Sequence, residues 1–112
     1  MAFEISPGEY LRVTVNWTNT GSQTHDFLLE AYYGKIVDKT MYYWDKTQQY
    51  ESNSNPGETR DTNLDFIHPF PTEDPEGNPT SGQTVDVYVR IIDPETNEVL
   101  DEYPDPGALY VK

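Results

Sequence analysis

The sequence predicts an all-β protein, built as an antiparallel β-sandwich in a single domain that spans residues 1–112. Three observations support this prediction. Apolar side chains alternate with polar ones along several segments, which is the pattern of strands with one buried face. No segment shows the 3.6-residue spacing of an amphipathic helix. Nine prolines and seven glycines punctuate the chain at intervals typical of antiparallel β-proteins.

Two alternating segments lie in the first third of the chain. The first covers residues 10–19 and places on one face Leu11, Val13, Val15 and Trp17. Turn residues 19–22 separate it from a second strand, residues 25–34. The expected inward side chains of this second strand are Phe27, Leu29, Ala31 and Tyr33. Gly34 and Lys35 then permit a tight turn before a third strand that reaches Trp44.

The second half holds the clearest strand and two expected loops. Residues 45–63 are polar and predict a long loop that enters a weaker strand, residues 62–67. Residues 68–82 carry four prolines, which favour a rigid crossover loop over a central strand. The strongest alternation is in residues 84–92, with inward Val85, Val87, Val89 and Ile91. Two further strands are expected after it, in residues 98–103 and 107–112.

The chain is strongly acidic, with 20 Asp and Glu, 7 Lys and Arg, and a formal net charge of −13. A basic patch that would bind phosphate groups is absent, so we expect no nucleic-acid partner. We also expect no membrane insertion, because no run of 18 apolar residues exists. The absence of cysteine excludes disulfides and thiolate metal sites. No cofactor is expected.

Three stretches share the order of turns and strands found in one group of domains. Residues 6–36, SPGEYLRVTVNWTNTGSQTHDFLLEAYYGKI, combine a Pro-Gly-Glu turn with two alternating strands around an Asn-x-Gly turn. A second Pro-Gly-Glu occupies residues 56–58, and residues 87–103 read VYVRIIDPETNEVLDEY. This order resembles the immunoglobulin-like domains of the CARDB kind in prokaryotic surface and secreted proteins. The resemblance implies an immunoglobulin-like antiparallel β-sandwich of about seven strands, acting as an adhesion, spacer or interaction module without catalytic residues.

Aromatic side chains provide the candidate contact sites. On an extended strand, Tyr42 and Trp44 share one face, and Met41 and Tyr43 share the other, so one of two large apolar faces is a candidate for exposure. Exposed aromatic rings anchor protein partners or stack on sugars. Burial of both faces, with one beneath the 68–82 loop, is the structural alternative. The candidate contact residues are Tyr42, Trp44, Tyr50 and Phe70.

Two Asp-Pro-Glu-x-Asn segments raise the question of calcium. Their alternating oxygen-bearing side chains include the weak candidates Asp74, Glu76, Asp93 and Glu95. Counted as 12-residue calcium loops, both lack glycine at the sixth position and glutamate at the twelfth. Turns are therefore favoured, with Asp first, Pro second and Asn in the left-handed conformation.

These observations favour a non-enzymatic structural or protein-interaction module within a larger assembly. His25 and His68 fit no catalytic or metal-binding pattern and are expected to be loop or surface residues. The alternatives are a carbohydrate-binding module that uses exposed aromatics and a calcium-stabilised adhesin repeat. Localisation on a virion or a cell surface is favoured, and residues 1–10 lack the features of a signal peptide. Expected partners are assembly proteins, further copies of the chain, or carbohydrate. Strand pairing with a neighbour through residues 1–6 or 107–112 is a further expectation.

Overall fold

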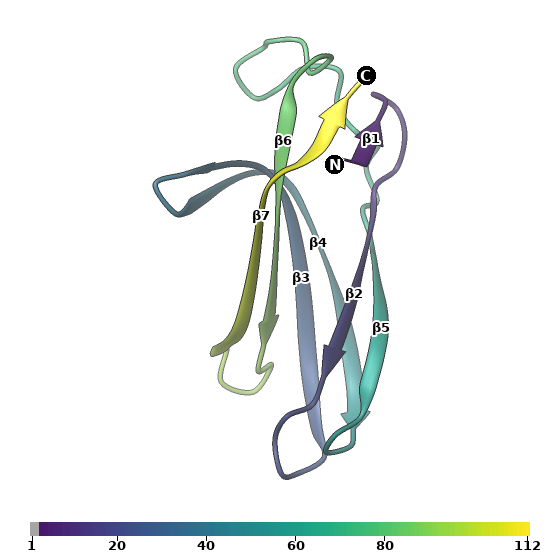
Figure 1. Ribbon diagram of the computed structural model, residues 1–112, viewed down its shortest axis with the longest axis vertical. Helices are drawn as coiled ribbons and strands as arrows, with labels where there is room; N and C mark the ends of the chain where they lie inside the picture. Colours follow the sequence, from purple (N-terminus) through teal and green to yellow (C-terminus); the bar gives the residue numbers. More distant parts are fainter. Residues whose placement is uncertain (1–2) are drawn as a thin grey trace.

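The computed structural model describes residues 3–112, which form seven β-strands and no helix. Figure 1 shows their arrangement. The strands are β1 (Phe3–Ile5), β2 (Arg12–Thr18), β3 (His25–Val37), β4 (Thr40–Ser54), β5 (Thr59–Asp65), β6 (Thr84–Ile92) and β7 (Val99–Val111). The predicted all-β class is therefore confirmed. No helix that could span a membrane is found among these residues.

The strands form two sheets of unequal width. One has five strands in the order β1-β7-β6-β3-β4, and the other pairs β2 with β5. The wider sheet curls, and the two-stranded sheet packs against its concave side (Figure 1). The expectation of purely antiparallel pairing was wrong in one place, because β1 pairs with β7 in parallel. The wide sheet is thus a mixed half-barrel.

The hydrophobic core lies between the sheets and follows the predicted alternation. All of the inward residues expected on β3 and β6 are buried, and Trp17 of β2 is 3% exposed. Its ring packs against Phe27 with a centroid distance of 5.0 Å. The indole Nε1 donates a hydrogen bond to Thr62 Oγ1 at 2.7 Å, so its one polar atom is satisfied within the core.

The first hairpin turns four residues later than predicted. The expected turn at Gly34–Lys35 was wrong, since β3 continues through both residues to Val37 and pairs with β4 up to Thr40. The turn is formed by Asp38 and Lys39, whose φ angles of 50° and 66° are those of a two-residue type I′ loop. Gly34 instead marks a β-bulge, where the register shifts after Tyr33.

The long polar loop expected at residues 45–63 was also wrong. Strand β4 runs to Ser54, and a short turn at residues 55–58 leads into β5. The polar sequence of β4 reflects its position at the edge of the sheet, where both faces of its second half meet solvent. Strand β5 begins three residues before the expected residues 62–67 and ends at Asp65.

The C-terminal region forms one strand instead of two. The expected strands at residues 98–103 and 107–112 are joined in β7, with a bulge opposite Asp86. The 68–82 segment is a loop as predicted, with a single bridge between Glu73 and Pro79. Within the chain, β1 pairs with the end of β7, which places the first and last strands side by side (Figure 1). The expected pairing of a terminal strand with a neighbouring molecule stays a prediction. Residues 1 and 2 of the expected strand 1–6 lie outside the described residues.

Candidate functional site

A hairpin arm leaves the body of the molecule. We define the arm as residues 35–43, the distal parts of β3 and β4 beyond the Gly34 bulge. Figure 1 shows it projecting to one side, away from the other strands. Strand β6 follows β3 only as far as the pair Gly34–Asp86, so the arm consists of two strands paired only with each other. Such a ribbon exposes both of its faces to solvent.

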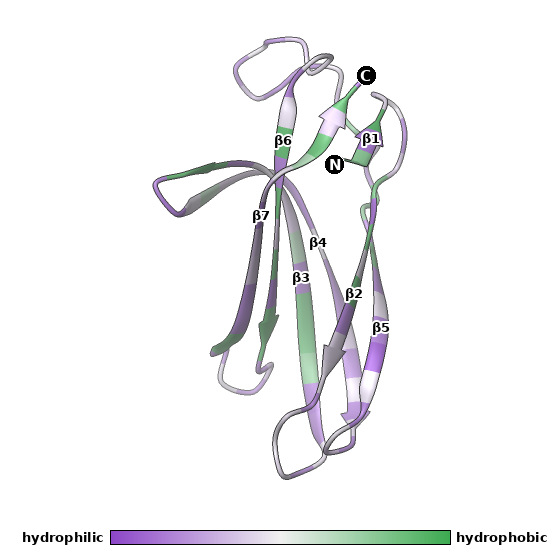
Figure 2. Cartoon of the chain, viewed as in Figure 1, coloured by the Kyte–Doolittle hydropathy of each residue, from purple (hydrophilic) through white to green (hydrophobic). Residues whose placement is uncertain are grey.

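The arm carries large apolar and aromatic side chains. Exposed fractions are 61% for Tyr42, 51% for Tyr43 and 52% for Val37. Figure 2 shows hydrophobic colouring along the arm and hydrophilic residues at its tip. A projecting element that exposes several large apolar side chains is typical of a binding surface.

The base of the arm is fixed by a close approach of two backbones. A Cβ atom at Gly34 would collide with the carbonyl oxygen of Tyr42 and lie 2.8 Å from Cα of Tyr43. Only glycine therefore allows β3 and β4 to approach this closely at the bulge. The bulge leaves Trp44 without a partner in the β3–β4 register and turns its side chain towards the core. The direction of the arm is thus set by backbone packing.

Asp86 of β6 supports the arm from the sheet below. Its Oδ2 accepts a hydrogen bond from the backbone N–H of Ile36 at 2.7 Å. Its Oδ1 accepts another from the N–H of Gly107, also at 2.7 Å, in the bulge of β7. Both N–H groups lie where strands depart from regular pairing, so a single carboxylate replaces two missing ladder acceptors. Lys35 Nζ also donates to the carbonyl oxygen of Thr84.

A cluster of tyrosine and charged side chains adjoins the arm on the outer face of the wide sheet. We call this cluster the tyrosine patch; its members are Glu30, Tyr32, Tyr43, Tyr88 and Arg90. The ring of Tyr32 lies 5.2 Å from that of Tyr43 and 5.9 Å from that of Tyr88. The guanidinium carbon of Arg90 lies 5.4 Å from the centre of the Tyr32 ring, a cation–π geometry. The rings and the guanidinium of the patch therefore pack against one another.

Glu30 is the hydrogen-bond acceptor at the centre of the patch. Its Oε1 accepts from the Tyr32 hydroxyl at 2.6 Å and from Arg90 Nε at 2.7 Å. Burial, with the Glu30 carboxylate as the second cause, raises the pKa of Tyr32 to about 12. Burial also raises the pKa of Tyr88 to about 12, with Glu102 as the second cause. Both tyrosines therefore remain neutral near neutral pH.

The four predicted contact residues are not brought together. Tyr42 lies on the arm, and Trp44 is half-buried at its base. Phe70 is 2% exposed and stacks on Tyr33 at 4.9 Å between ring centroids, so it belongs to the core. Tyr50 is exposed but lies eight residues along β4 from Tyr42, roughly 25 Å at the rise of an extended strand. Its hydroxyl donates to Asp26 Oδ2 at 2.7 Å.

The two acidic segments form turns. Asp93 Oδ1 accepts from the N–H of Glu95, and Asn97 has the predicted left-handed conformation with φ of 60°. In the other segment, Asp74 Oδ1 accepts from the N–H groups of Glu76 and Asn78. There the left-handed position is taken by Gly77, not by Asn78 as predicted.

The Asp74 and Asp93 carboxylates each accept backbone hydrogen bonds within their turns. Backbone hydrogen bonds, from Asn78 to Asp74 and from Glu95 to Asp93, lower the pKa of each aspartate. Glu76 and Glu95 are exposed on the turn surfaces. Within residues 3–112, no group of three or more His, Asp or Glu side chains is placed to hold a metal ion.

A cleft of about 710 Å³ lies between the arm and the 68–82 loop. Arm residues that line it include Lys35, Val37 and Tyr42, and the loop contributes Asp74, Glu76 and Asn78. Two of the four predicted aromatic residues, Tyr42 and Trp44, and one of the acidic turns thus meet at this cleft. It combines aromatic surface with carboxylates, which suits a partner that offers both apolar and basic groups.

Sequence reasoning identified the aromatic segment but missed the geometry of the arm. The signal for it was the pair Asp38–Lys39 between apolar residues, since aspartate tolerates the left-handed conformation that a type I′ turn requires. Tyr43, Tyr32 and Arg90 were not predicted as contact residues. The sequence places Tyr32 and Tyr88 on predicted strands. It does not give the strand register that sets Tyr32 opposite Tyr88.

Each histidine lies near an aspartate from another part of the chain. His25 Nε2 lies 3.4 Å from Asp93 Oδ2, and His68 Nδ1 lies 3.4 Å from Asp45 Oδ2. Comparison of the chain with protein families, with curated proteins and with solved structures found no match.

Proposed function

We propose that this protein is a non-enzymatic interaction module that joins a larger protein assembly through the arm and the adjoining tyrosine patch. The observation that carries this proposal is the arm itself. It exposes Val37, Tyr42 and Tyr43 at half or more of their surface, on a ribbon that covers no part of the core. An element that contributes little to folding and exposes aromatic side chains is suited to docking.

The strand order supports an immunoglobulin-like relationship. In such domains the second and fifth strands are neighbours in one sheet, and the third, sixth and seventh strands belong to the other, which gains edge strands in some types. Here β2 and β5 form the pair, and β7, β6, β3 and β4 lie in that order in the wider sheet. The curl of the sheet and the projecting arm are departures from a flat two-layer sandwich. Localisation on a virion or cell surface remains part of this proposal.

A protein partner is favoured over carbohydrate by the placement of the aromatics. A sugar platform needs neighbouring rings that share a face, whereas Tyr42 and Tyr50 lie far apart along β4. Trp44 is held by core contacts, with its ring 6.3 Å from Tyr33 and 6.4 Å from Phe70. In contrast, tyrosine and arginine side chains over a packed base are the residue types that dominate binding energy at protein interfaces.

Photo-crosslinking in the producing cell tests this proposal. A photoreactive amino acid at position 42 should yield a discrete protein adduct of defined mass, either with a second copy or with another protein. The same group at position 10 is the control, because Tyr10 is 66% exposed but lies outside the arm. The adduct should disappear when Tyr43 is replaced by serine, a change that leaves the core intact. Equal adducts from both positions would contradict an arm-specific interface.

Light scattering and glycan binding separate the alternatives. The molar mass from light scattering over a series of protein concentrations tests for self-association. The same series with calcium or a chelator tests the calcium-stabilised adhesin repeat. The absence of an adduct at position 42, together with glycan binding that is lost in Tyr42→Ser, would replace the protein-interaction proposal with the carbohydrate one.

A further inference from the structure

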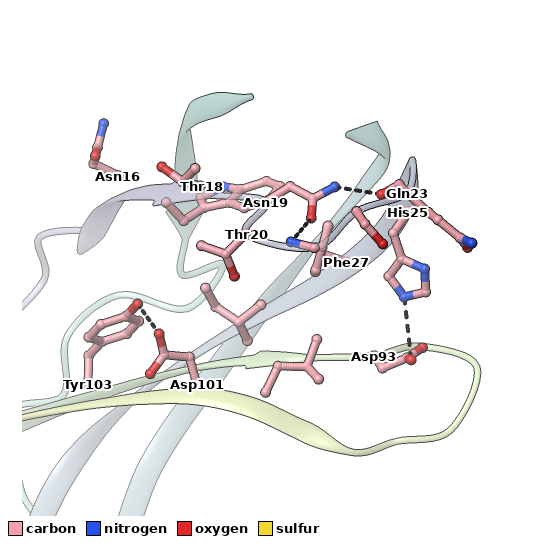
Figure 3. Close-up of a pocket in the computed structure, with 15 residues that line it drawn as sticks. Asn16, Thr18, Asn19, Thr20, Gln23, His25, Phe27, Asp93, Asp101 and Tyr103 are labelled. Carbon is pink, nitrogen blue, oxygen red and sulfur yellow. Dashed lines mark hydrogen bonds and ion pairs between the residues drawn. The ribbon is translucent and has the colours of Figure 1, made fainter. Parts of the chain in front are cut away.

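A groove separates β2 from the first half of β7 on the side of the molecule where the half-barrel is open. It has a volume of about 680 Å³ and is lined by 15 residues, ten of which are labelled in Figure 3. The two-stranded sheet is narrower than the sheet it covers, so the groove runs between the edge of one sheet and the inner face of the other. Side chains of Phe27 and Ile91 belong to this inner face.

The outer edge of β2 has unpaired backbone groups. Hydrogen bonds from Phe66 N to Leu11 O, and from Asn19 N to Glu58 O, fix odd-numbered residues as those that bond to β5. The groups that point away from β5 therefore belong to Arg12, Thr14, Asn16 and Thr18. Within residues 3–112, no hydrogen bond outside the β2–β5 ladder uses the backbone of these four residues. This edge offers a template for an added strand.

The opposite wall of the groove is closed to strand pairing. Pro104 of β7 has no N–H and pairs with Tyr88, so even-numbered residues of this part of β7 point away from β6. The N–H of Glu102, which belongs to that set, already donates to Asp101 Oδ1 at 2.9 Å. Pro106 lies two residues after Pro104. The prolines and the engaged amide block this edge, whereas β2 lacks any such protection.

The other long side of the two-stranded sheet is also engaged. Thr47 Oγ1 of β4 donates to the carbonyl oxygen of Asp65 at 2.8 Å. The guanidinium of Arg60 donates to the carbonyl oxygens of Ser52 and Asn53 at 2.9 and 3.0 Å. These bonds tie β5 to β4. The β2 edge is thus the open one of this sheet.

The walls of the groove define what would bind there. Apolar surface comes from Leu100 and Tyr103, which are 44% and 43% exposed, above the buried Trp17. Asp93 and Asp101 line the same space. Residues 93–105 of this wall contain six acidic residues and no basic one. An extended segment that alternates apolar and basic side chains would match both the apolar surface and the charge.

The end of the groove is held in place before any partner binds. Asn19 is 2% exposed, and its Nδ2 donates to the carbonyl oxygens of Gln23 and Ser54 at 3.0 and 2.9 Å. Its Oδ1 accepts from the N–H of Gly21 at 2.9 Å (Figure 3). The loop between β2 and β3 is therefore preorganised, which lowers the entropic cost of binding along the edge.

We propose that the β2 edge accepts an extended, basic segment of a partner protein as an added antiparallel or parallel strand, with apolar side chains in the groove. This surface is distinct from the arm and does not depend on the function proposed for it. A second copy of this chain is a poor occupant, because each copy has a net charge of −13 and the groove wall is itself acidic.

The probe for the test is a synthetic eight-residue peptide of alternating valine and lysine, with blocked ends. We expect its addition to shift the backbone amide resonances of Thr14, Asn16 and Thr18 and to slow their hydrogen exchange at least tenfold. Binding should weaken as salt is raised, since lysine–carboxylate attraction is screened. The same peptide with glutamate in place of lysine is the matched control and should not bind.

Two variants locate the site on opposite walls. Thr18→Pro removes an N–H from the open edge without removing a β5 ladder bond, and Leu100→Glu places a charge on the exposed apolar wall. Each should weaken peptide binding at least tenfold. Thr59→Ala is the control for Thr18→Pro, because it breaks the same Thr18–Thr59 hydroxyl contact but leaves the edge unchanged. Circular dichroism checks that each variant folds.

Several outcomes would overturn this proposal. One is the absence of amide shifts along β2 at millimolar peptide, and another is shifts confined to the arm. Protection of the β2 amides that grows with protein concentration, without peptide, would assign the edge to a second copy. Replacement of Tyr42 and Tyr43 by serine should leave peptide binding unchanged, so failure of the arm proposal and failure of this one remain distinguishable.

Discussion

Asp86 illustrates how one side chain can hold two irregular backbone segments. Ile36 lies just beyond the last pair between β3 and β6, and Gly107 lies in the bulge of β7 on the other side of β6, so neither N–H group has a ladder acceptor. The two oxygens of one carboxylate receive these groups, one each. A residue with a single acceptor oxygen could serve only one of the two segments. The exit of the arm and the bend in β7 are therefore coupled at this residue.

Replacement of Asp86 by alanine should lower the free energy of unfolding by about 1–3 kcal/mol, since two partly buried N–H groups lose their acceptor. Asp86→Asn, which keeps one acceptor oxygen, should lose less. Chemical denaturation measures both values. Asp105→Ala, at an exposed aspartate of β7, serves as the control. Equal stability of Asp86→Ala and the control would show that water satisfies these groups.

Tyr33 gives the protein a defined response to alkali. Burial, with the nearby Asp45 charge as the second cause, raises the pKa of Tyr33 to about 12 in the folded protein. In the unfolded chain the pKa is about 10, so the protonated phenol favours folding. This contribution is complete below pH of about 10 and is lost as pH rises towards the folded value.

Tyr33→Phe removes this titration, so the midpoint of alkaline unfolding should move to higher pH. The measurement is circular dichroism against pH between 8 and about 12.5, the range set by the two pKa values. Tyr110→Phe, at a 41% exposed position, should leave the midpoint unchanged. A similar shift in both variants would assign the effect to the loss of any tyrosine.

At the scale of the element, the arm combines a long ribbon with a rigid base. Gly34 allows the close backbone approach, and Trp44 anchors the bulge in the core beside Tyr33 and Phe70. The exposed Tyr42 and Tyr43 are therefore attached to a fixed base. A docking surface on such an element retains its orientation, which reduces the entropy lost on binding.

Gly34→Ala should destabilise the protein by about 1–3 kcal/mol, the usual cost of forcing a methyl group into packed structure. Amide resonances of the arm should change more than those of β2 and β5. Gly57→Asn is a suitable comparison, because Gly57 has a φ of 78° but open space at its Cβ position. Asparagine tolerates that conformation, so little change is expected there. If Gly34→Ala is equally mild, the close approach does not constrain the arm.

The elements also show what alternation can and cannot predict. The inward faces of β2, β3 and β6 were predicted residue by residue, because apolar side chains alternate along these strands. Strand β4 was mostly missed, since an edge strand solvated on both faces has no such pattern. Gly34 was interpreted as a turn because glycine marks both turns and bulges. A cover formed by the 68–82 loop was weighed only as the structural alternative, and alternation could not decide it, because the burial of Phe70 depends on how that loop folds back over Tyr33.

At the scale of the whole molecule, the termini complete the fold. Ile5 of β1 is 3% exposed and pairs with Val111, which is fully buried. The N–H of Lys112 donates to the carbonyl oxygen of Ile5 at 2.9 Å. The first and last strands thus close one end of the core together. The net charge of −13 disfavours nonspecific self-association.

Ile5→Ala should therefore lower the free energy of unfolding by about 2–4 kcal/mol, as expected for removing a buried aliphatic side chain. Phe3→Ala is the control from the same strand, because Phe3 is 63% exposed and should matter little. Thermal and chemical denaturation provide the comparison. A small effect of Ile5→Ala would indicate that β1 detaches from β7 without loss of the core.

The parallel pairing of β1 with β7 has a mechanical consequence. Phe3 lies opposite Leu109, and Ile5 lies opposite Val111, so the two chain ends leave the pair in opposite directions. Tension applied through both ends would pull the strands past each other in shear. All hydrogen bonds of the pair would then bear the load at once, whereas an antiparallel pair pulled from one end opens bond by bond. A domain tethered at both ends would resist force through its shortest strand.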